Sequence, residues 1–278
     1  MTWVSYRQDM PELPEVETVV RSLAPHLPGR RIVAAEFSSK HVTPGNRAAL
    51  AKKLAGRTIQ SVTRRGKFIL IALDQGTLVV HLGMTGQLLL NPSPSDHMYG
   101  IFRLDASESA DSQALVYRDP RQFGSIAWHK DASQAIGKLG PEPLSIGVEE
   151  FTARLKKRKT RMKALLLNQT FLAGIGNIYA DEILYAAKVH PLAIAARLSK
   201  QRAAQVHQAM REVLIMAIEH GGSSISDYVN AAGEQGWFQV LHNAYGREGQ
   251  PCMRCGGVIE KILVAQRGTH FCPQCQKR

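Results

Sequence analysis

Cysteine is scarce in this chain of 278 residues, and its four copies all fall near the end, between Cys252 and Cys275. A secreted disulfide-rich domain would spread its cysteines along the chain, so this clustering argues against that class and indicates a metal site. Long apolar runs are missing too, since no uninterrupted stretch approaches the roughly 18–20 residues that cross a bilayer. No basic segment followed by a long apolar one opens the chain, so we expect no secretory signal and interpret the protein as intracellular.

Acidic residues are also few, with 23 Asp and Glu against 35 Lys and Arg, which gives a net charge of +12. An excess of this size suggests a polyanionic partner, and nucleic acid is the commonest one. A basic surface that only aids solubility is the alternative. The hydrophobic content of 44% is ordinary for a globular protein, and the length suffices for two modest domains and a small appendage.

The first half of the chain combines two helices with many short strands. Apolar residues at helical spacing predict a helix over about 14–26, with Pro14 in its first turn and Glu15 and Glu17 at the positive end of its dipole. A second helix is expected over about 47–55, with Asn46 as its N-cap. Six β-favouring runs follow, at 58–63, 67–73, 77–82, 99–104, 114–118 and 125–128. Their close spacing favours an antiparallel sandwich or barrel over βαβ units.

The second half is helical and ends in a small module. A linker with one glycine and two prolines spans Lys138 to Ser145. Helices are expected over about 149–158, 161–168, 177–188 and 199–219, and a cysteine-bearing hairpin closes the chain. We therefore predict an α+β multidomain protein. Its expected parts are a β-sandwich domain over 11–140, a helical domain over 141–240 and a terminal module over 241–278.

The cysteines form two Cys-x-x-Cys pairs separated by sixteen residues: Cys252, Cys255, Cys272 and Cys275. Two such pairs let four thiolates converge tetrahedrally on Zn²⁺, and this spacing fits a zinc ribbon. Disulfides or a redox pair are the alternatives. A site with four thiolate ligands is closed, so the zinc would be structural and would fold a hairpin too small to be stable alone.

Two segments of the helical half could contact phosphates. Seven of the ten residues in 154–163 are Lys or Arg and none is acidic, which favours phosphate contact without sequence readout. In 172–184, two glycines at a turn precede Asn177 at a helix entrance, where backbone N–H groups could hold a phosphate. A capped helix without a ligand explains the second pattern equally well.

Three short motifs in the β-rich half have competing interpretations. Lys67 lies in R-R-G-K-F, His81 and Met84 lie in H-L-G-M-T-G, and Arg121 and Phe123 lie in R-D-P-R-Q-F-G. Taken alone, a histidine of this kind is more often structural, and methionine and phenylalanine are more often core. Flanking Gly and Pro residues place Met84, Arg121 and Phe123 at loop tips. Apolar side chains beside an arginine can there fill the gap left by an extruded base.

The stretch M-P-E-L-P-E-V-E, from Met10, resembles the start of a protein although nine residues precede it. An α-amino group has a pKa near ~8 against about 10.4 for lysine, so more of it is a free nucleophile at neutral pH. An N-terminal proline could therefore condense with a sugar aldehyde carbon and permit strand scission by elimination. If Asp9–Met10 stay attached, the Pro11 nitrogen is an amide and cannot attack.

These motifs, together with L-G-P-E-P-L, G-I-G-N-I-Y, G-G-S-S and the four-cysteine tail, occur in the order found in bacterial formamidopyrimidine-DNA glycosylases. The resemblance covers roughly 10–278. It implies an N-terminal helix with a β-sandwich, a helix–two-turn–helix domain and a zinc finger. It also implies removal of oxidised purines (8-oxoguanine and formamidopyrimidines) from double-stranded DNA, with strand cleavage by β,δ-elimination.

The resemblance assigns roles to residues that match the family's motifs. Pro11 resembles the Schiff-base nucleophile, Glu12 the acid that protonates the opening sugar, and Lys67 and Arg267 the proton donors for β- and δ-elimination. The DNA-binding positions would be His81, Met84, Arg121, Phe123, Lys159 and Asn177, of which Met84, Arg121 and Phe123 are similar to the trio that fills the void. The loop after Gly222 is similar to one that covers the everted base. One zinc ion, a bacterial cytoplasmic, nucleoid-associated location, no membrane contact and a monomer are also implied.

Three features depart from the family's pattern. Gln122 stands where many members have a second basic residue, and Ser95 stands where a histidine is often found, so no role is transferred to it. The third departure is the extension. Because the chemistry needs a free amine, we predict that Met10 is the true initiator and that residues 1–9 come from an upstream start codon or from added sequence.

Two other functions fit parts of the pattern. An endonuclease VIII-like glycosylase would use the same scaffold on oxidised pyrimidines, but its opening is usually P-E-G-P-E, and Leu13 favours the purine enzyme. A non-catalytic, zinc-dependent DNA-binding protein would explain the charge and the cysteines. The presence of Pro11, Glu12 and Lys67 counts against it, unless the extension is retained.

Overall fold

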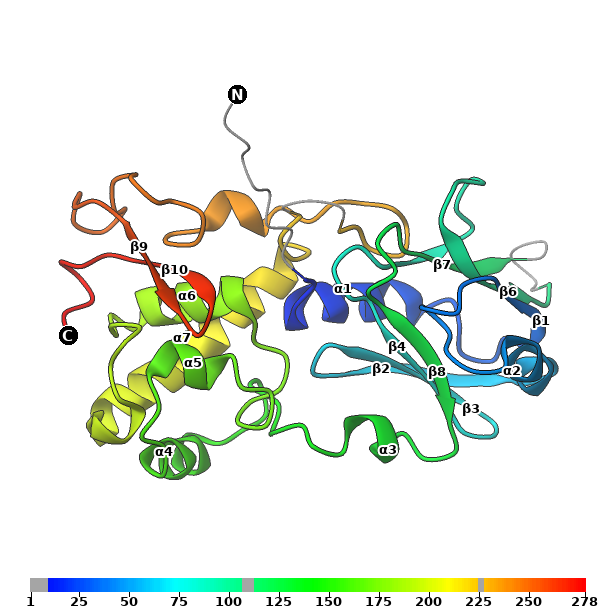
Figure 1. Cartoon of the computed structure of the whole chain (residues 1–278), viewed down its shortest axis with the longest axis horizontal. Coiled ribbons are helices and arrows are strands. Elements are labelled where there is room, and N and C mark those ends of the chain that lie inside the picture. The colour runs from blue at the N-terminus through cyan, green and yellow to red at the C-terminus, as the bar shows by residue number, and fades with distance from the viewer. Residues whose placement is uncertain (1–9, 107–112, 225–227) are drawn as a thin grey trace. The chain divides into compact units, whose positions relative to one another are not determined.

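The computed structural model describes residues 10–106, 113–224 and 228–278, which form two compact units (Figure 1). Unit 1 runs to Gly137 and also includes Gly221–Gly236, whereas unit 2 consists of Lys138–His220 and Trp237–Arg278. The predicted α+β multidomain class is confirmed. Among the helices of the described residues, none is both long enough and apolar enough to span a bilayer.

Unit 1 is built on two four-stranded antiparallel sheets, with strand orders β1-β6-β7-β5 and β2-β3-β4-β8. The strands are β1 (Ile32–Phe37), β2 (Ile59–Arg65), β3 (Phe68–Leu73), β4 (Thr77–His81), β5 (Gln87–Leu90), β6 (Met98–Leu104), β7 (Ala114–Arg118) and β8 (Ser125–His129). Its helices are α1 (Leu13–Leu23), α2 (Arg47–Leu54) and the short α3 (Ser133–Ile136).

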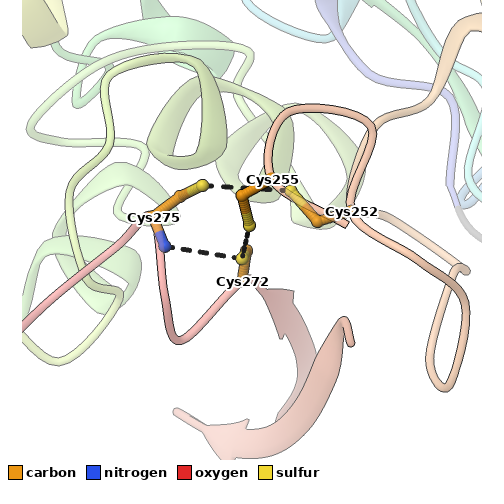
Figure 2. A group of neighbouring side chains, drawn as sticks. All are labelled: Cys252, Cys255, Cys272 and Cys275. Carbon is orange, nitrogen blue, oxygen red and sulfur yellow. Dashed lines mark hydrogen bonds between the residues drawn. The ribbon is translucent and has the colours of Figure 1, made fainter. Parts of the chain in front are cut away.

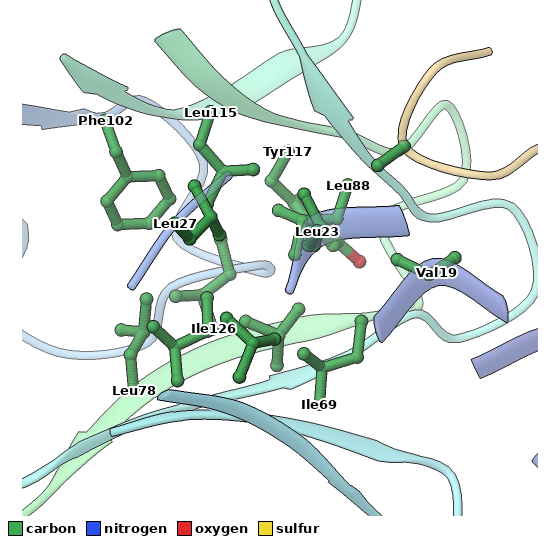
Figure 3. Close-up of a cluster of buried hydrophobic side chains, with 14 of the residues drawn as sticks. Val19, Leu23, Leu27, Ile69, Leu78, Leu88, Phe102, Leu115, Tyr117 and Ile126 are labelled. Carbon is green, nitrogen blue, oxygen red and sulfur yellow. The ribbon is translucent and has the colours of Figure 1, made fainter. Parts of the chain in front are cut away.

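The core of unit 1 lies between the two sheets and takes in one face of α1 (Figure 3). Val19, Leu23 and Leu27 lie between Ile69, Leu78 and Ile126 of one sheet and Leu88, Phe102, Leu115 and Tyr117 of the other, and each is at most 1% exposed. Burial of one such aliphatic side chain contributes roughly 1.5–3 kcal/mol. The apolar spacing that predicted α1 is therefore the spacing of its buried face.

Local signals explain where the helices begin and end. Pro14 lies in the first turn of α1, and the Asn46 side chain accepts a hydrogen bond from the N–H of Ala49 at 2.9 Å, which confirms it as the cap of α2. In unit 2, the hydroxyl of Ser199 accepts from the N–H of Arg202 at 3.1 Å at the start of the longest helix.

Unit 2 contains four α-helices among its described residues, followed by the cysteine-bearing module. The helices are α4 (Val148–Lys156), α5 (Met162–Leu166), α6 (Asn177–Ala186) and α7 (Lys200–Glu219), with two 3₁₀ turns at Ala195–Arg197 and Phe238–Leu241. The module ends in an antiparallel hairpin of β9 (Glu260–Val264) and β10 (Arg267–Phe271). Ala265 and Gln266 connect these strands and both have positive φ, as a tight two-residue hairpin turn requires.

A buried ion pair joins two helices of unit 2. The Nζ of Lys163 in α5 lies 2.7 Å from Oδ1 of Asp181 in α6, and their side chains are 0% and 1% exposed. Lys163 also donates to the carbonyl of Asn177 at 2.7 Å. Because both charges are out of water, neither can be removed without leaving the other uncompensated.

We predict that Lys163→Met lowers the free energy of unfolding by about 3–5 kcal/mol, because it leaves the Asp181 carboxylate buried without its cation. Native-state hydrogen exchange of the α6 amides measures this loss. Lys157→Met is the matched control, since Lys157 belongs to the same basic run but is exposed, and its effect should stay within about 0.5 kcal/mol. Equal losses in the two variants would contradict the prediction.

Candidate active site and zinc centre

The start of α1 holds Pro11 and Glu12 inside unit 1, where Pro11 is buried and Glu12 is 1% exposed. The Glu15 carboxylate fixes this turn, since its Oε2 accepts the N–H of Glu12 at 2.9 Å as one half of a capping box. Its Oε1 accepts the N–H of Ser223 at 2.7 Å. One buried carboxylate therefore holds both the candidate catalytic turn and the backbone at Ser223.

Lys67 occupies the tight turn between β2 and β3 and is 8% exposed. Gly66 precedes it with a φ of +57°, a conformation that glycine adopts easily. The next residue, Phe68, pairs with His81 across the sheet, and the two rings lie 4.9 Å apart. The turn thus places a lysine charge beside a histidine at the end of β4.

His81 is held as a neutral imidazole. Burial, together with the positive charge of Lys67, lowers the pKa of His81 to about 4. Its Nδ1 accepts the N–H of Gly83 at 3.2 Å, so in the neutral ring the proton is on Nε2. The side chain can therefore offer one N–H donor to an acceptor such as a phosphate oxygen, and it offers it without a charge.

The loop between β7 and β8 is organised by Asp119, which is fully buried. Its carboxylate accepts from the hydroxyl of Thr85 at 2.5 Å, from the N–H of Gly124 at 2.9 Å and from the N–H of Arg121 at 3.3 Å. A Cβ at Gly124 would lie 1.8 Å from the hydroxyl of Tyr117, so the backbone approach there requires glycine. A buried carboxylate with several donors fixes the loop firmly.

Arg121 and Phe123 project from this loop, as their flanking residues predicted. Arg121 is exposed, Phe123 is 59% exposed, and the guanidinium lies 4.8 Å from the centre of the Phe123 ring. An arginine over an aromatic face at this distance forms a cation–π contact. Met84 is half-buried in the turn that follows β4. The roles expected of these three residues in filling a base stack stay predictions.

The basic run 154–163 divides into structural and exposed residues. Arg154 donates to the carbonyls of Thr170 and Phe171, Lys156 donates to backbone carbonyls near 196–198, and Lys163 is fully buried. Lys156 is itself exposed, and so are the four other cations of the run: Lys157, Arg158, Lys159 and Arg161. Three cations of the run therefore make contacts within the fold, whereas the phosphate contact expected of Lys159 stays a prediction.

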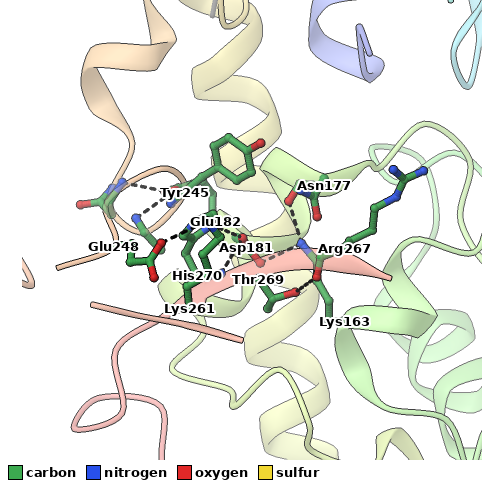
Figure 4. Close-up of polar contacts among 12 residues, drawn as sticks. Lys163, Asn177, Asp181, Glu182, Tyr245, Glu248, Lys261, Arg267, Thr269 and His270 are labelled. Carbon is green, nitrogen blue, oxygen red and sulfur yellow. Dashed lines mark hydrogen bonds and ion pairs between the residues drawn. The ribbon is translucent and has the colours of Figure 1, made fainter. Parts of the chain in front are cut away.

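Asn177 begins α6, as predicted, next to a buried polar network (Figure 4). Asp181 joins α5 to β10 in this network. Its Oδ1 accepts a hydrogen bond from Nζ of Lys163. Its Oδ2 accepts the backbone N–H of His270 at 2.9 Å and lies 3.1 Å from Nδ1 of the His270 ring. Arg267 is exposed at the first position of β10, three residues before His270. The helix that presents Asn177 is therefore bonded directly to the strand that presents Arg267.

The four cysteines converge as the spacing predicted (Figure 2). Their sulfur atoms all lie within 4.8 Å of one another, with 3.9 Å between Cys252 and Cys275 and 3.5 Å between Cys255 and Cys272. These distances bracket the separation of about 3.8 Å that a tetrahedral Zn–S bond of ~2.3 Å implies. They are far longer than a disulfide bond, and all four cysteines are free. The donor set therefore fits one structural zinc ion.

Residues of α6 also support the zinc ligands. The hydroxyl of Tyr185 lies 3.2 Å from Cys252 Sγ, and the N–H of Arg254 donates to the same sulfur at 3.4 Å. Burial by itself raises the pKa of the Cys252 thiol, but these hydrogen bonds outweigh burial and lower that pKa to about 6. Glu182, 2% exposed, accepts from the N–H groups of three consecutive residues, 243 to 245.

The sequence did not indicate that the carboxylates of Glu15, Asp119 and Asp181 organise these sites. From the sequence, Glu15 is expected only to complement the helix dipole, and no role is expected for Asp119 or Asp181. A weak signal existed for Asp181, because it lies beside Glu182 in an otherwise apolar helix, where carboxylates are buried only with partners. Asp119 carried no comparable signal, since an aspartate before a proline is common in exposed turns.

Comparison with known proteins agrees with this arrangement along nearly the whole chain. Residues 10–126 match the N-terminal domain of formamidopyrimidine-DNA glycosylase, 139–229 its H2TH domain, and 249–278 the zinc finger found in FPG and IleRS. The formamidopyrimidine-DNA glycosylase of Solibacter usitatus is 50% identical over 271 residues, covering 97% of this chain and 100% of the relative. The chain belongs to the formamidopyrimidine-DNA glycosylase family.

Solved structures of the family extend the similarity to the fold. The Lactococcus lactis Fpg in complex with abasic-site DNA has a TM-score of 0.84 and 37% identity, covering 96% of this chain and 100% of that one. A complex of the same enzyme with DNA containing N7-benzyl-Fapy-dG gives the same values. Family membership confirms the zinc finger, whereas the roles of individual residues remain predictions.

We predict one zinc per chain, held by all four cysteines. Cys272→Ser should lower the zinc content to below about a tenth and remove the exchange protection of β9 and β10, because metal binding supplies the folding free energy of such a module. Metal analysis and hydrogen exchange measure the two effects. Rapid reaction of all four thiols with a thiol reagent in the native, zinc-replete protein would contradict the assignment.

We also predict that His81 stays neutral down to about pH 4, with its proton on Nε2. Long-range ¹H–¹⁵N spectra between pH 4 and 8 report both the tautomer and the pKa. Replacing the neighbouring charge by Lys67→Met should raise the pKa of His81, because the repulsion of a second positive charge disappears. A midpoint near 6.5 in the unmodified protein would show that the ring is solvated.

Proposed function

We propose that this chain is a base-excision-repair enzyme that removes oxidised purines from double-stranded DNA and cuts the strand at the resulting abasic site. Membership of the family and similarity to Lactococcus lactis Fpg in its DNA complexes support this activity. The observation that carries the mechanism is Pro11 followed by Glu12, both buried at the first turn of α1. A secondary amine beside a carboxyl group is the pair that imine chemistry requires.

In the proposed first step, the secondary amine of Pro11 attacks C1′ of the damaged nucleotide and the bond from C1′ to the base breaks. The amine proton passes to the base, which leaves as a neutral molecule. Glu12 supplies a proton to the ring oxygen of the sugar, so that the ring opens and a cationic iminium forms between C1′ and the nitrogen.

The iminium then permits two eliminations. It acidifies C2′, whose proton leaves as the 3′-phosphate departs, and a second elimination releases the 5′-phosphate. We assign proton donation in the β-elimination to Lys67 and in the δ-elimination to Arg267. Lys67 lies in the turn between β2 and β3, and Arg267 begins β10 directly after a two-residue turn, so the backbone that carries each cation is fixed.

The remaining assigned residues bind the duplex. His81, Asn177 and Lys159 contact phosphates, and Met84, Arg121 and Phe123 occupy the space that the extruded base leaves. The zinc finger sets the position of Arg267 through the hairpin β9–β10. We place the enzyme in the bacterial cytoplasm at the nucleoid, acting as a monomer.

Processing of the N-terminus is part of the proposal. We propose that translation starts at Met10 and that its removal exposes Pro11, because an acylated nitrogen has no free lone pair. The family match beginning at residue 10 supports this start. The loop after Gly222 that we expected to cover the base includes 225–227, which lie outside the described residues.

Borohydride trapping on a duplex containing 8-oxoguanine tests the mechanism. Protein started at Met10 should form a covalent adduct that peptide mapping places on Pro11. Protein started at Met1 with Met10→Leu cannot initiate internally and should retain residues 1–9, which intact mass verifies. It should form no adduct and cut no strand. Adduct formation by this extended protein would refute Pro11 as the nucleophile, because borohydride would then have trapped an imine on a different amine.

Lesion choice separates the nearest alternative. The purine enzyme should excise 8-oxoguanine opposite cytosine at least about tenfold faster than thymine glycol, a difference of roughly 1.4 kcal/mol in transition-state stabilisation. The reverse order would favour the endonuclease VIII-like function. If protein that begins at Pro11 (the Pro11 form) binds damaged duplex but excises no lesion, the result would favour a non-catalytic DNA-binding protein.

A further inference from the structure

Gln122 lies between Arg121 and Phe123, but its side chain takes the opposite direction. Its neighbours are exposed, whereas Gln122 is half-buried. Its φ is +55°, in the left-handed region that costs a non-glycine residue on the order of 1 kcal/mol. A strained conformation of this kind persists only when surrounding contacts hold it.

Two hydroxyl groups hold the Gln122 side chain. Ser39 Oγ donates to Oε1 at 2.5 Å, and Nε2 donates to Tyr99 Oη at 3.2 Å. The backbone N–H of Gln122 donates to the carbonyl of Asp119 at 3.1 Å. Both ends of the side-chain amide are therefore engaged within unit 1, on two segments outside the loop.

The partners of Gln122 are themselves fixed. Ser39 is 6% exposed, and its Oγ accepts the N–H groups of His41 and Val42 at 3.2 and 3.3 Å. Tyr99 Oη lies 3.1 Å from Nδ1 of His97, and the His97 carbonyl accepts the N–H of Asp119 at 3.0 Å. Hydrogen bonds thus connect Asp119, Gln122, Tyr99 and His97 in a closed ring.

We propose that Gln122 is a positioning residue, which locks the loop so that Arg121 and Phe123 are preset as a stacked pair before DNA binds. This inference rests on the proposed function of that pair. Ordering a rotamer-rich side chain at an interface costs about 0.5–1.5 kcal/mol, so presetting two of them raises affinity for a duplex with a vacated base. Because its amide is already bonded at both ends, Gln122 acts through the loop and not as a direct phosphate ligand.

Hydrogen exchange of the free protein tests the lock. In Gln122→Ala, the amides of Phe123 and Gly124 should exchange about tenfold faster, since the loss of the side-chain bonds lets the loop open. Gln122→Glu can still accept from both hydroxyl groups and should preserve most of the protection. Gln60→Ala, at an exposed position of β2, is the matched control and should change nothing.

Affinity for DNA tests the consequence. Gln122→Ala should weaken binding to a duplex with an abasic-site analogue about five- to tenfold, as expected for the lost preorganisation of two side chains. Binding to undamaged duplex should not change. Equal weakening on both duplexes would instead indicate that Gln122 contacts the DNA backbone. Unchanged hydrogen exchange in Gln122→Ala would show that its side chain does not hold the loop. Either result overturns the proposal. If the Pro11 form failed to excise any lesion, the proposed function would fall while the exchange experiment still decided the role of Gln122.

Discussion

The carboxylate of Glu15 is the contact on which the candidate catalytic turn depends. It accepts the N–H groups of Glu12 and Ser223, which are separated by more than two hundred residues in the chain, and it is almost completely buried. A buried charge of this kind is stable only while its donors stay in place. The first turn of α1 and Ser223 are therefore fixed together, and this gives the Pro11 nitrogen a defined position.

Helix α6 performs the corresponding task in unit 2. Asp181 joins Lys163 to His270, Glu182 binds three successive backbone N–H groups, and Tyr185 contacts a zinc ligand. These contacts all lie on one helix whose first residue is Asn177. Helix α6 thus supports Asn177, the zinc finger and the hairpin with Arg267, so loss of zinc would disturb more than the hairpin. Side chains that hydrogen-bond to metal ligands commonly have this orienting effect.

Local patterns predicted most elements but not two strands. β5 was missed because its first three residues are all buried, which gives no alternation to detect. β1 was missed because a shift of register between Ile32 and Ala34 breaks the two-residue period, so its burial repeats every three residues. The basic run shows another limit: charge is visible in a sequence, but whether a lysine such as Lys163 faces solvent or a buried aspartate is not.

The sequence by itself determined the helix spacing, the caps, the zinc ligands and the family, because these depend on residues close together in the chain or on motifs in a fixed order. It also predicted which side chains stand at loop tips. Only the tertiary structure decided which carboxylates are buried as organising groups, and that Gln122 points inward between two exposed neighbours. Those outcomes depend on donors tens to hundreds of residues away, and only folding brings such groups within hydrogen-bonding distance.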